Sequence, residues 1–216
     1  MSIIGNFINA LLHLDKYLNV IIQNYGMWTY ALIFLMIFCE TGLVITPFLP
    51  GDSILFAAGA LAATGSFKIA ILFVVLYLAA VIGDTVNYHI GKKIGTKILE
   101  KEDVKYLNKE YLKKAHTFYE RHGSMTIVVG RFIPIIRTFV PFVAGIREMS
   151  YLKFIIYNVL EGLLWVTLFL GGGYLFGNLP FIKRHFSYVV IAIIIISIIP
   201  VAVTFIREKR NGGKKE

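Results

Sequence analysis

Residues 34–63 read FLMIFCETGLVITPFLPGDSILFAAGALAA, and this stretch decides the fold because it places acids and prolines inside an apolar run. Its two acids, Glu40 and Asp52, stand on either side of a break made by Pro47, Pro50 and Gly51. Proline removes a backbone donor and clashes with the preceding turn, so a straight helix is not expected here. Ionisable groups at membrane depth are costly and mark sites that bind or move a charged species. The stretch therefore predicts a broken, re-entrant segment that carries function.

A second apolar run, MTIVVGRFIPIIRTFVPFVAGI at residues 125–146, has the same design with the opposite charge. It contains Arg131 and Arg137 together with the candidate break residues Pro134, Pro141 and Gly145. A guanidinium is always charged, and its planar fork matches a phosphate or a carboxylate two bonds at a time. Two roles stay open for these arginines: they bind a phosphate, or they pair with carboxylates and brace the hairpins.

The two acids of the first run also have alternative roles. Glu40 and Asp52 could hold the arginines until a phosphate displaces the two acids. They could instead carry coupling protons, because burial raises the pKa of a carboxyl group and a neighbouring arginine lowers it. Asp52 has a simpler explanation as the cap of the helix that follows the break. Glu40 has no such explanation and ranks higher.

Composition identifies an integral membrane protein. Of the 216 residues, 57% are hydrophobic, and the mean hydropathy is +0.71, which is more apolar surface than a water-soluble domain can hide. The net charge of +9 gathers mainly in residues 91–122 and after residue 206, next to apolar segments. The positive-inside bias explains this distribution better than nucleic-acid binding. The single cysteine, Cys39, excludes an intrachain disulfide and a cysteine-based metal cluster.

We expect one membrane domain, residues 1–216. Hydrophobic periodicity and segment length predict where its helices and connecting segments lie. The predicted parts are an amphipathic interfacial helix (1–26), a re-entrant hairpin (27–65), a span (67–90), a cytoplasmic basic segment (91–123), a second re-entrant hairpin (124–147), two spans (151–177 and 186–206) and a cytoplasmic tail (207–216). Basic residues place the segment 91–123 and the C-terminus in the cytoplasm.

The two broken segments look related. Residues 56–59 read FAAG and residues 142–145 read FVAG, and in each case a proline lies eleven or twelve residues before the glycine. The distribution of basic residues predicts that the first hairpin opens toward the outside of the membrane and the second toward the cytoplasm. Such a pair is typical of an inverted-repeat transporter with its site near the midplane, so the predicted fold is an all-α membrane protein with two opposed re-entrant helical hairpins.

Polar residues on two of the spans form a secondary candidate site. Residues three apart share a helix face, which is expected to turn toward the bundle. The members are Asp84, Asn87, Tyr88, Asn158 and Glu161. The five histidines show no metal-ligand spacing. We therefore expect no metal, no cofactor and no enzymatic activity.

Three motifs in order, residues 40–53, the Gly83-Asp84 pair and Arg-x-x-Pro-x-x-Arg-x-x-x-Pro-x-x-Ala-Gly at 131–145, resemble the DedA family of bacterial inner-membrane proteins. That family is related to the eukaryotic VTT-domain lipid scramblases. The resemblance covers residues 40–177, most of the chain. Glu161 departs from the family pattern, in which a small residue is expected beside Gly162.

The resemblance implies lipid translocation in the bacterial cytoplasmic membrane. Family members are linked to the return of undecaprenyl phosphate to the cytoplasmic leaflet, others to phosphatidylethanolamine, with membrane-potential and antibiotic-resistance phenotypes. The residues that the family treats as functional match Glu40, Asp52, Arg131 and Arg137. The expected partner is thus a phospholipid or a polyprenyl phosphate.

Other functions remain open from the sequence. The same acids would serve a proton- or sodium-coupled transporter of a small solute or an ion-homeostasis protein, and a membrane-embedded phosphatase is the minority hypothesis. The sequence leaves open the coupling ion, proton or sodium, and a homo-oligomer.

Overall fold

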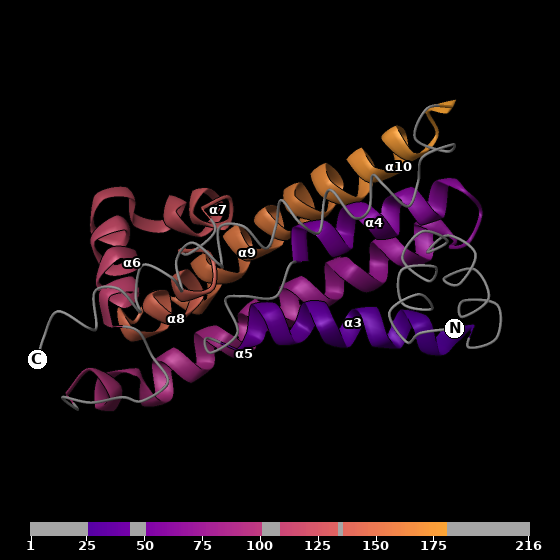
Figure 1. Cartoon of the computed structure of the whole chain (residues 1–216). Coiled ribbons are helices and arrows are strands. Elements are labelled where there is room, and N and C mark those ends of the chain that lie inside the picture. The colour runs from indigo at the N-terminus through magenta and orange to yellow at the C-terminus, as the bar shows by residue number, and fades with distance from the viewer. Residues whose placement is uncertain (1–25, 44–50, 101–108, 134–135, 181–216) are drawn as a thin grey trace, which may run out of the picture. The chain divides into compact units, whose positions relative to one another are not determined.

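The computed structural model describes residues 26–43, 51–100, 109–133 and 136–180 (Figure 1). These residues form helices joined by turns and contain no strand, which confirms the all-α prediction for the described part of the chain. The expected amphipathic helix at 1–26, apart from its last residue, and the expected span at 186–206 and tail at 207–216 lie outside the described residues. Three of the predicted break residues, Pro47, Pro50 and Pro134, lie outside them too.

Within the described residues, two continuous helical stretches are long and apolar enough to cross a membrane. One is Ile69–Gly95, within α5 (Ile69–Glu100), and the other is Tyr151–Gly177. The second consists of α9 (Tyr151–Val166), a π-helical turn (Thr167–Gly171) and α10 (Gly172–Gly177). They coincide with two predicted spans.

The helix that contains the first predicted span, 67–90, extends beyond that span. α5 continues to Glu100, into the segment expected to be a separate cytoplasmic region. The residues beyond Ile90 include three lysines, which are good helix formers and keep the helix intact after it leaves an apolar environment.

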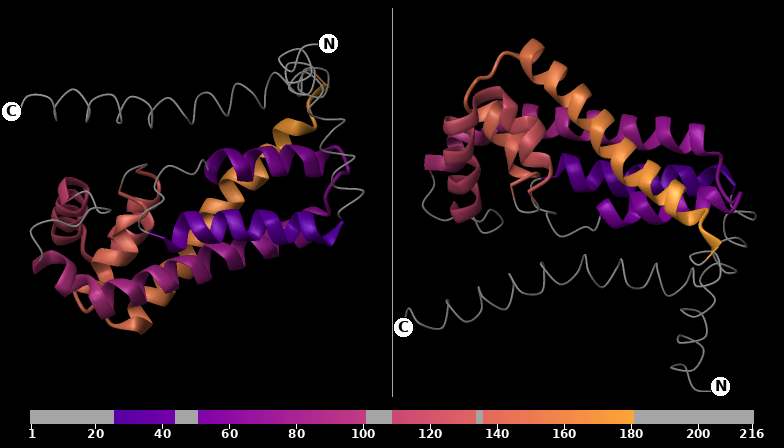
Figure 2. Two further views of the ribbon diagram at one scale, coloured as in Figure 1. Left: turned by 60° about the horizontal axis from the view of Figure 1, so that its bottom comes forward. Right: turned by 90° about the horizontal axis from the view of Figure 1, so that it is seen from above.

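The chain forms two compact units that alternate along the sequence. Of the described residues, the first unit comprises 26–30, 51–72 and 169–180, and the second comprises 31–43, 73–100, 109–133 and 136–168. Among the described residues of the first unit, α4 (Gly51–Ala63) and α10 lie side by side (Figure 2). Gly59 and Gly173 allow this contact, because a Cβ atom at either position would collide with the backbone of the other stretch.

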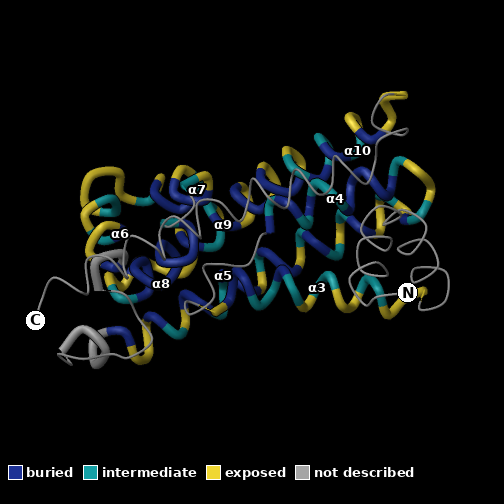
Figure 3. Tube along the Cα trace, viewed as in Figure 1, coloured by how far each residue is buried: buried dark blue, intermediate teal, exposed yellow. Residues whose placement is uncertain are grey.

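The second unit holds most of α3 (Met27–Gly42), α5 and α9, together with three shorter helices. These are α6 (Lys109–His122), α7 (Thr126–Arg131) and α8 (Phe139–Ile146), with a 3-10 turn (Gly123–Met125) before α7. α3 runs beside α5, with Gly42 against the backbone of Gly83. α8 is buried almost throughout (Figure 3) and packs against α6 and α7.

The second broken segment is a helix, a break and a helix. α7 and α8 contact each other, and the break spans residues 132–138. Pro141 and Gly145 were expected at the break, but both lie inside α8. Pro141 is tolerated because it occupies the first turn, where the backbone N–H has no partner within the helix. The re-entrant path of both broken segments and the inverted repeat stay predictions.

Candidate functional site

Five charged side chains from five different elements are buried in the second unit. Glu40 lies near the end of α3, Asp84 in α5, Arg131 at the end of α7, Arg137 in the turn before α8 and Glu161 in α9. Their exposed fractions lie between 1% and 8%. Buried charges are rare unless they are paired, so their contacts define the site.

Arg131 lies between two carboxylates. Its Nη1 atom is 2.6 Å from Asp84 Oδ2, and its Nε atom is 2.8 Å from Glu161 Oε1. Its Cζ atom also lies 4.1 Å from the centroid of the Trp165 ring, a cation–π arrangement. Three contacts from two helices therefore hold this guanidinium in place.

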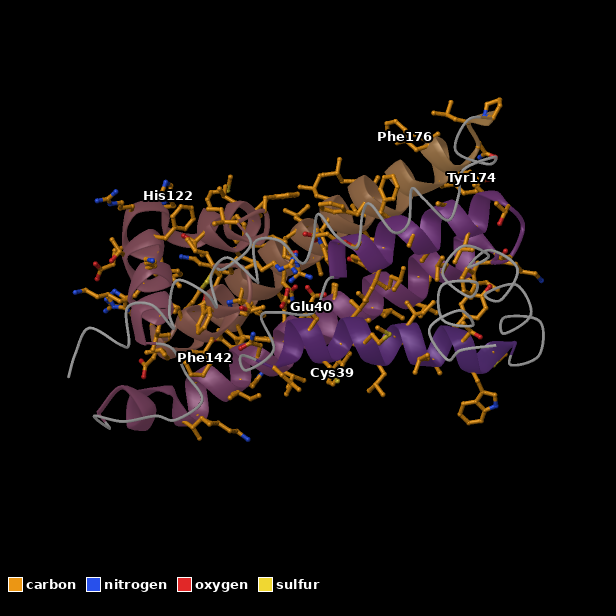
Figure 4. The ribbon with its side chains drawn as sticks, in the orientation of Figure 1. Cys39, Glu40, His122, Phe142, Tyr174 and Phe176 are labelled. Atoms are coloured by element: carbon orange, nitrogen blue, oxygen red, sulfur yellow. The ribbon has the colours of Figure 1, made fainter. Side chains whose placement is uncertain are left out.

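Arg137 forms an ion pair and a hydrogen bond with Glu40, in which Nη2 donates to Oε1. Arg137 lies outside the helices, in the turn that connects α7 to α8. Figure 4 shows Glu40 and its neighbour Cys39 leaving α3 on opposite sides, so that only the glutamate joins the buried cluster.

Asn87 connects the two broken segments to α5 without a charge. Its Nδ2 atom donates to the carbonyl oxygen of Thr41, at 2.9 Å, and to that of Thr138, at 2.8 Å. These carbonyls belong to the last turn of α3 and to the residue before α8. Carbonyls in the last turn of a helix have no partner within that helix, so the buried carbonyl of Thr41 needs another donor. Asn87 supplies that donor and, through its second N–H, also joins the end of α3 to the start of α8.

Two other members of the secondary polar site join neighbouring elements. Asn158 Nδ2 donates to the carbonyl oxygen of Val81, at 3.0 Å, and to Thr85 Oγ1, at 3.2 Å, which joins α9 to α5. The Tyr88 hydroxyl donates to the carbonyl oxygen of Met149, just before α9. Asn158, Tyr88 and Asn87 are all buried, so their hydrogen bonds hold together the helices that carry the charges.

The structure brings together most of the residues singled out in the sequence, in a different grouping. Asp84 and Glu161, assigned to a secondary site, contact Arg131 directly. Asp52 belongs to the first unit, in the first turn of α4, where the helix dipole favours an acid. Gly51 is the first residue of α4.

Sequence reasoning missed Trp165. It follows Glu161 by four residues on α9, so both side chains lie on one face of the helix. That spacing was the available signal, and the ring is almost completely buried.

The cluster has a clear chemical capacity. Paired guanidiniums can receive a phosphate if the anion displaces a carboxylate, because both anions use the same donors. Within the described ranges no group of three or more His, Cys, Asp or Glu residues could hold a metal ion.

Comparison with known proteins places this arrangement among membrane proteins. Residues 49–175 match the VTT domain family. The chain is 47% identical over 216 residues to the protein DedA of Escherichia coli K12, covering 99% of each chain. It is 38% identical over 192 residues to an uncharacterised membrane protein of Mycobacterium tuberculosis H37Rv, covering 85% of this chain and 83% of the relative. It is 36% identical over 169 residues to the inner membrane protein YghB of E. coli K12, covering 78% and 77%. No solved structure matches the chain.

Proposed function

Because the chain belongs to the DedA family of bacterial membrane proteins, we propose that it moves a phosphate-bearing lipid between the leaflets of the cytoplasmic membrane. Undecaprenyl phosphate is the first candidate for this cargo. Lipid transport requires a group that binds an anionic headgroup inside the membrane and releases it again. The buried Arg137–Glu40 pair is the observation that carries the proposal.

Arg137 fits the role of headgroup ligand because of where it lies. It stands in the turn between α7 and α8, and a turn can change its backbone angles with less loss of hydrogen bonding than a helix. Its partner Glu40 comes from a different element, so the pair can open when a phosphate replaces the carboxylate. Glu40 thereby keeps the guanidinium neutralised while no lipid is bound.

Arg131 fits a supporting role. Its contacts with Asp84, Glu161 and the Trp165 ring would all have to break before it could turn toward a ligand. Its charge still favours an anion nearby. We assign the direct phosphate contact first to Arg137 and the supporting field to Arg131, and we retain Asp52 as a second acid of the transport cycle.

Removal of Arg137 tests the proposal in proteoliposomes. We expect Arg137→Ala to slow the movement of undecaprenyl phosphate between leaflets by roughly 10- to 100-fold, since a hydrogen bond to a charged group is worth about 1.5–3 kcal/mol. Arg137→Lys should also be impaired, because an ammonium cannot reproduce the bidentate fork. The readout is the fraction of lipid phosphate accessible from outside, normalised to the amount of folded protein.

Arg147→Ala is the matched control. Arg147 is a partly exposed arginine of the same unit, paired with Glu120, and we expect its removal to leave transport unchanged. Equal transport by the wild type and Arg137→Ala would contradict the proposal. Stronger transport of phosphatidylethanolamine would identify a different cargo, and release of inorganic phosphate from the lipid would indicate a phosphatase instead.

A further inference from the structure

Asp84 and Glu161 form a close pair of acids around one guanidinium. Each approaches Arg131, at 2.6 Å and 2.8 Å respectively, and the two carboxyl groups also lie within hydrogen-bonding reach of each other. Their exposed fractions are 2% and 1%. Water therefore does not screen the repulsion between them.

The charges around this pair do not balance. One guanidinium faces two carboxylates, which leaves one negative charge in excess if both acids are ionised. The other nearby guanidinium, Arg137, is itself paired with Glu40. The groups that face the pair from the surrounding elements are thus Glu40 from α3, Arg131 from α7 and Arg137 from the turn before α8. None of them supplies the missing positive charge.

Hydrogen bonding gives a second, separate indication that one of the two acids carries a proton. In the described part of the chain, Asp84 Oδ1 and Glu161 Oε2 are buried acceptors without a donor. Two ionised carboxylates can only accept, so neither can satisfy the other. A proton on one of them would supply both the missing charge and the missing donor, as in other pairs of acids that share a site.

We propose that Asp84 and Glu161, the two acids beside Arg131, share one exchangeable proton between their carboxyl groups. This pair is then a proton-binding site of the protein. Proton uptake forms one O–H bond on a carboxylate oxygen and releases no other group. Loss of the proton breaks that bond and transfers the proton to water. The site differs from Glu40 and Asp52, the acids to which the sequence assigns a possible role in carrying coupling protons.

The site predicts how proton binding and headgroup binding affect each other, and this step rests on the function proposed above. A phosphate that displaces Glu40 from Arg137 adds negative charge near Asp84 and Glu161, which strengthens their hold on the proton. By linkage, the proton strengthens the binding of the anion by the same factor. Headgroup and proton should therefore travel together, and departure of the headgroup should favour release of the proton.

Infrared spectroscopy of the purified protein tests proton binding without any transport. In a detergent that lacks carbonyl groups, the wild type at neutral pH should show the C=O stretching band of a buried, protonated carboxylic acid, with a shift in D₂O. Glu161→Gln and Asp84→Asn should each abolish the band, because a single carboxylate is balanced by Arg131. Glu120→Gln, which changes an exposed acid of the same unit, should leave it unchanged.

Three results would overturn the proposal: no acid band in the wild type, a band that survives both Glu161→Gln and Asp84→Asn, or an ionised pair whose spectrum responds to sodium. A pH-sensitive dye trapped in proteoliposomes tests the coupling. Lipid movement by the wild type should carry protons, and Glu161→Gln should reduce protons carried per lipid at least tenfold. A protein that shows the band but moves no lipid would contradict the transport function alone.

Discussion

At the scale of single residues, the site depends on neutral side chains as much as on charged ones. Asn87 is completely buried, and its one amide nitrogen serves carbonyls from two segments that are far apart in the sequence. Thr41 precedes it by 46 residues and Thr138 follows it by 51. An asparagine can do this because its NH₂ group has two donors. The ends of both broken segments are therefore positioned by a group that does not compete with the ion pairs.

Asn87→Asp should destabilise the protein strongly. The substitution removes both donors and places a carboxylate against two carbonyl oxygens, and each unpartnered buried group costs about 1–3 kcal/mol, so we expect the free energy of unfolding to fall by roughly 2–6 kcal/mol. Denaturant titration in detergent, followed by circular dichroism, measures the change. Asn178→Asp is the control, since exposed Asn178 donates to a single carbonyl and its replacement should cost less than about 0.5 kcal/mol. Equal losses in both variants would contradict the role of Asn87.

At the scale of elements, glycines determine how closely α5 and α8 approach. A Cβ atom at Gly91 would collide with the backbone of Phe142, and one at Gly145 would collide with the backbone of Tyr88 and Lys92. The two helices therefore interlock through reciprocal contacts. Small residues at such positions are typical of membrane helix packing, where backbones must come close for dispersion contacts to form.

Gly91→Ala and Gly145→Ala should each destabilise the α5–α8 contact. Overpacking a tight contact costs about 1–3 kcal/mol, and the melting temperature should fall accordingly. Gly171→Ala is the matched control, because no atom lies within 4 Å of the added methyl group and alanine favours a helix by up to about 1 kcal/mol. If the three variants melted together, close packing would not explain the glycines.

At the scale of the whole molecule, the residues on either side of α5 predict which end of this helix faces the cytoplasm. Lys68 lies just before this helix, and Lys113 lies in α6 beyond its end, and both side chains are exposed. The excess of basic residues between positions 91 and 122 predicts that the Lys113 side faces the cytoplasm. A helix long enough to span would then place Lys68 outside.

Cysteine labelling tests this orientation. In a Cys39→Ser background, Lys68→Cys should react with a membrane-impermeant maleimide in intact spheroplasts, and Lys113→Cys should react only after the membrane is opened. The two variants are matched, since each replaces one exposed lysine, the first before α5 and the second after it along the chain. The reverse pattern of labelling would overturn the predicted topology.

Sequence reasoning reached the helical class, the buried charges and two spans, because apolar length and misplaced ionisable residues are local signals. It could not predict which acid pairs with which arginine. Arg131 meets Asp84 across 47 residues and Arg137 meets Glu40 across 97, and each arginine had four acids to choose from. The sequence places Glu161 only in a secondary site, because nothing in the local pattern indicates its contact with Arg131. The extent of α5 could not be predicted, because hydropathy marks where an apolar segment ends and not where a helix ends.

The π-helical turn at Thr167–Gly171 also has a consequence for how this family can vary in length. A π turn holds one more residue than an α turn, so the loss of a single residue there would leave a continuous α-helix. Because the π turn already absorbs its extra residue within one turn, the residues downstream would keep their direction around the helix axis. Gly173 and Gly177 would therefore still face α4. The same deletion in the α-helical part of this stretch would rotate everything downstream by about 100°, so the π turn is the place where the helix can lose a residue and keep its contact with α4.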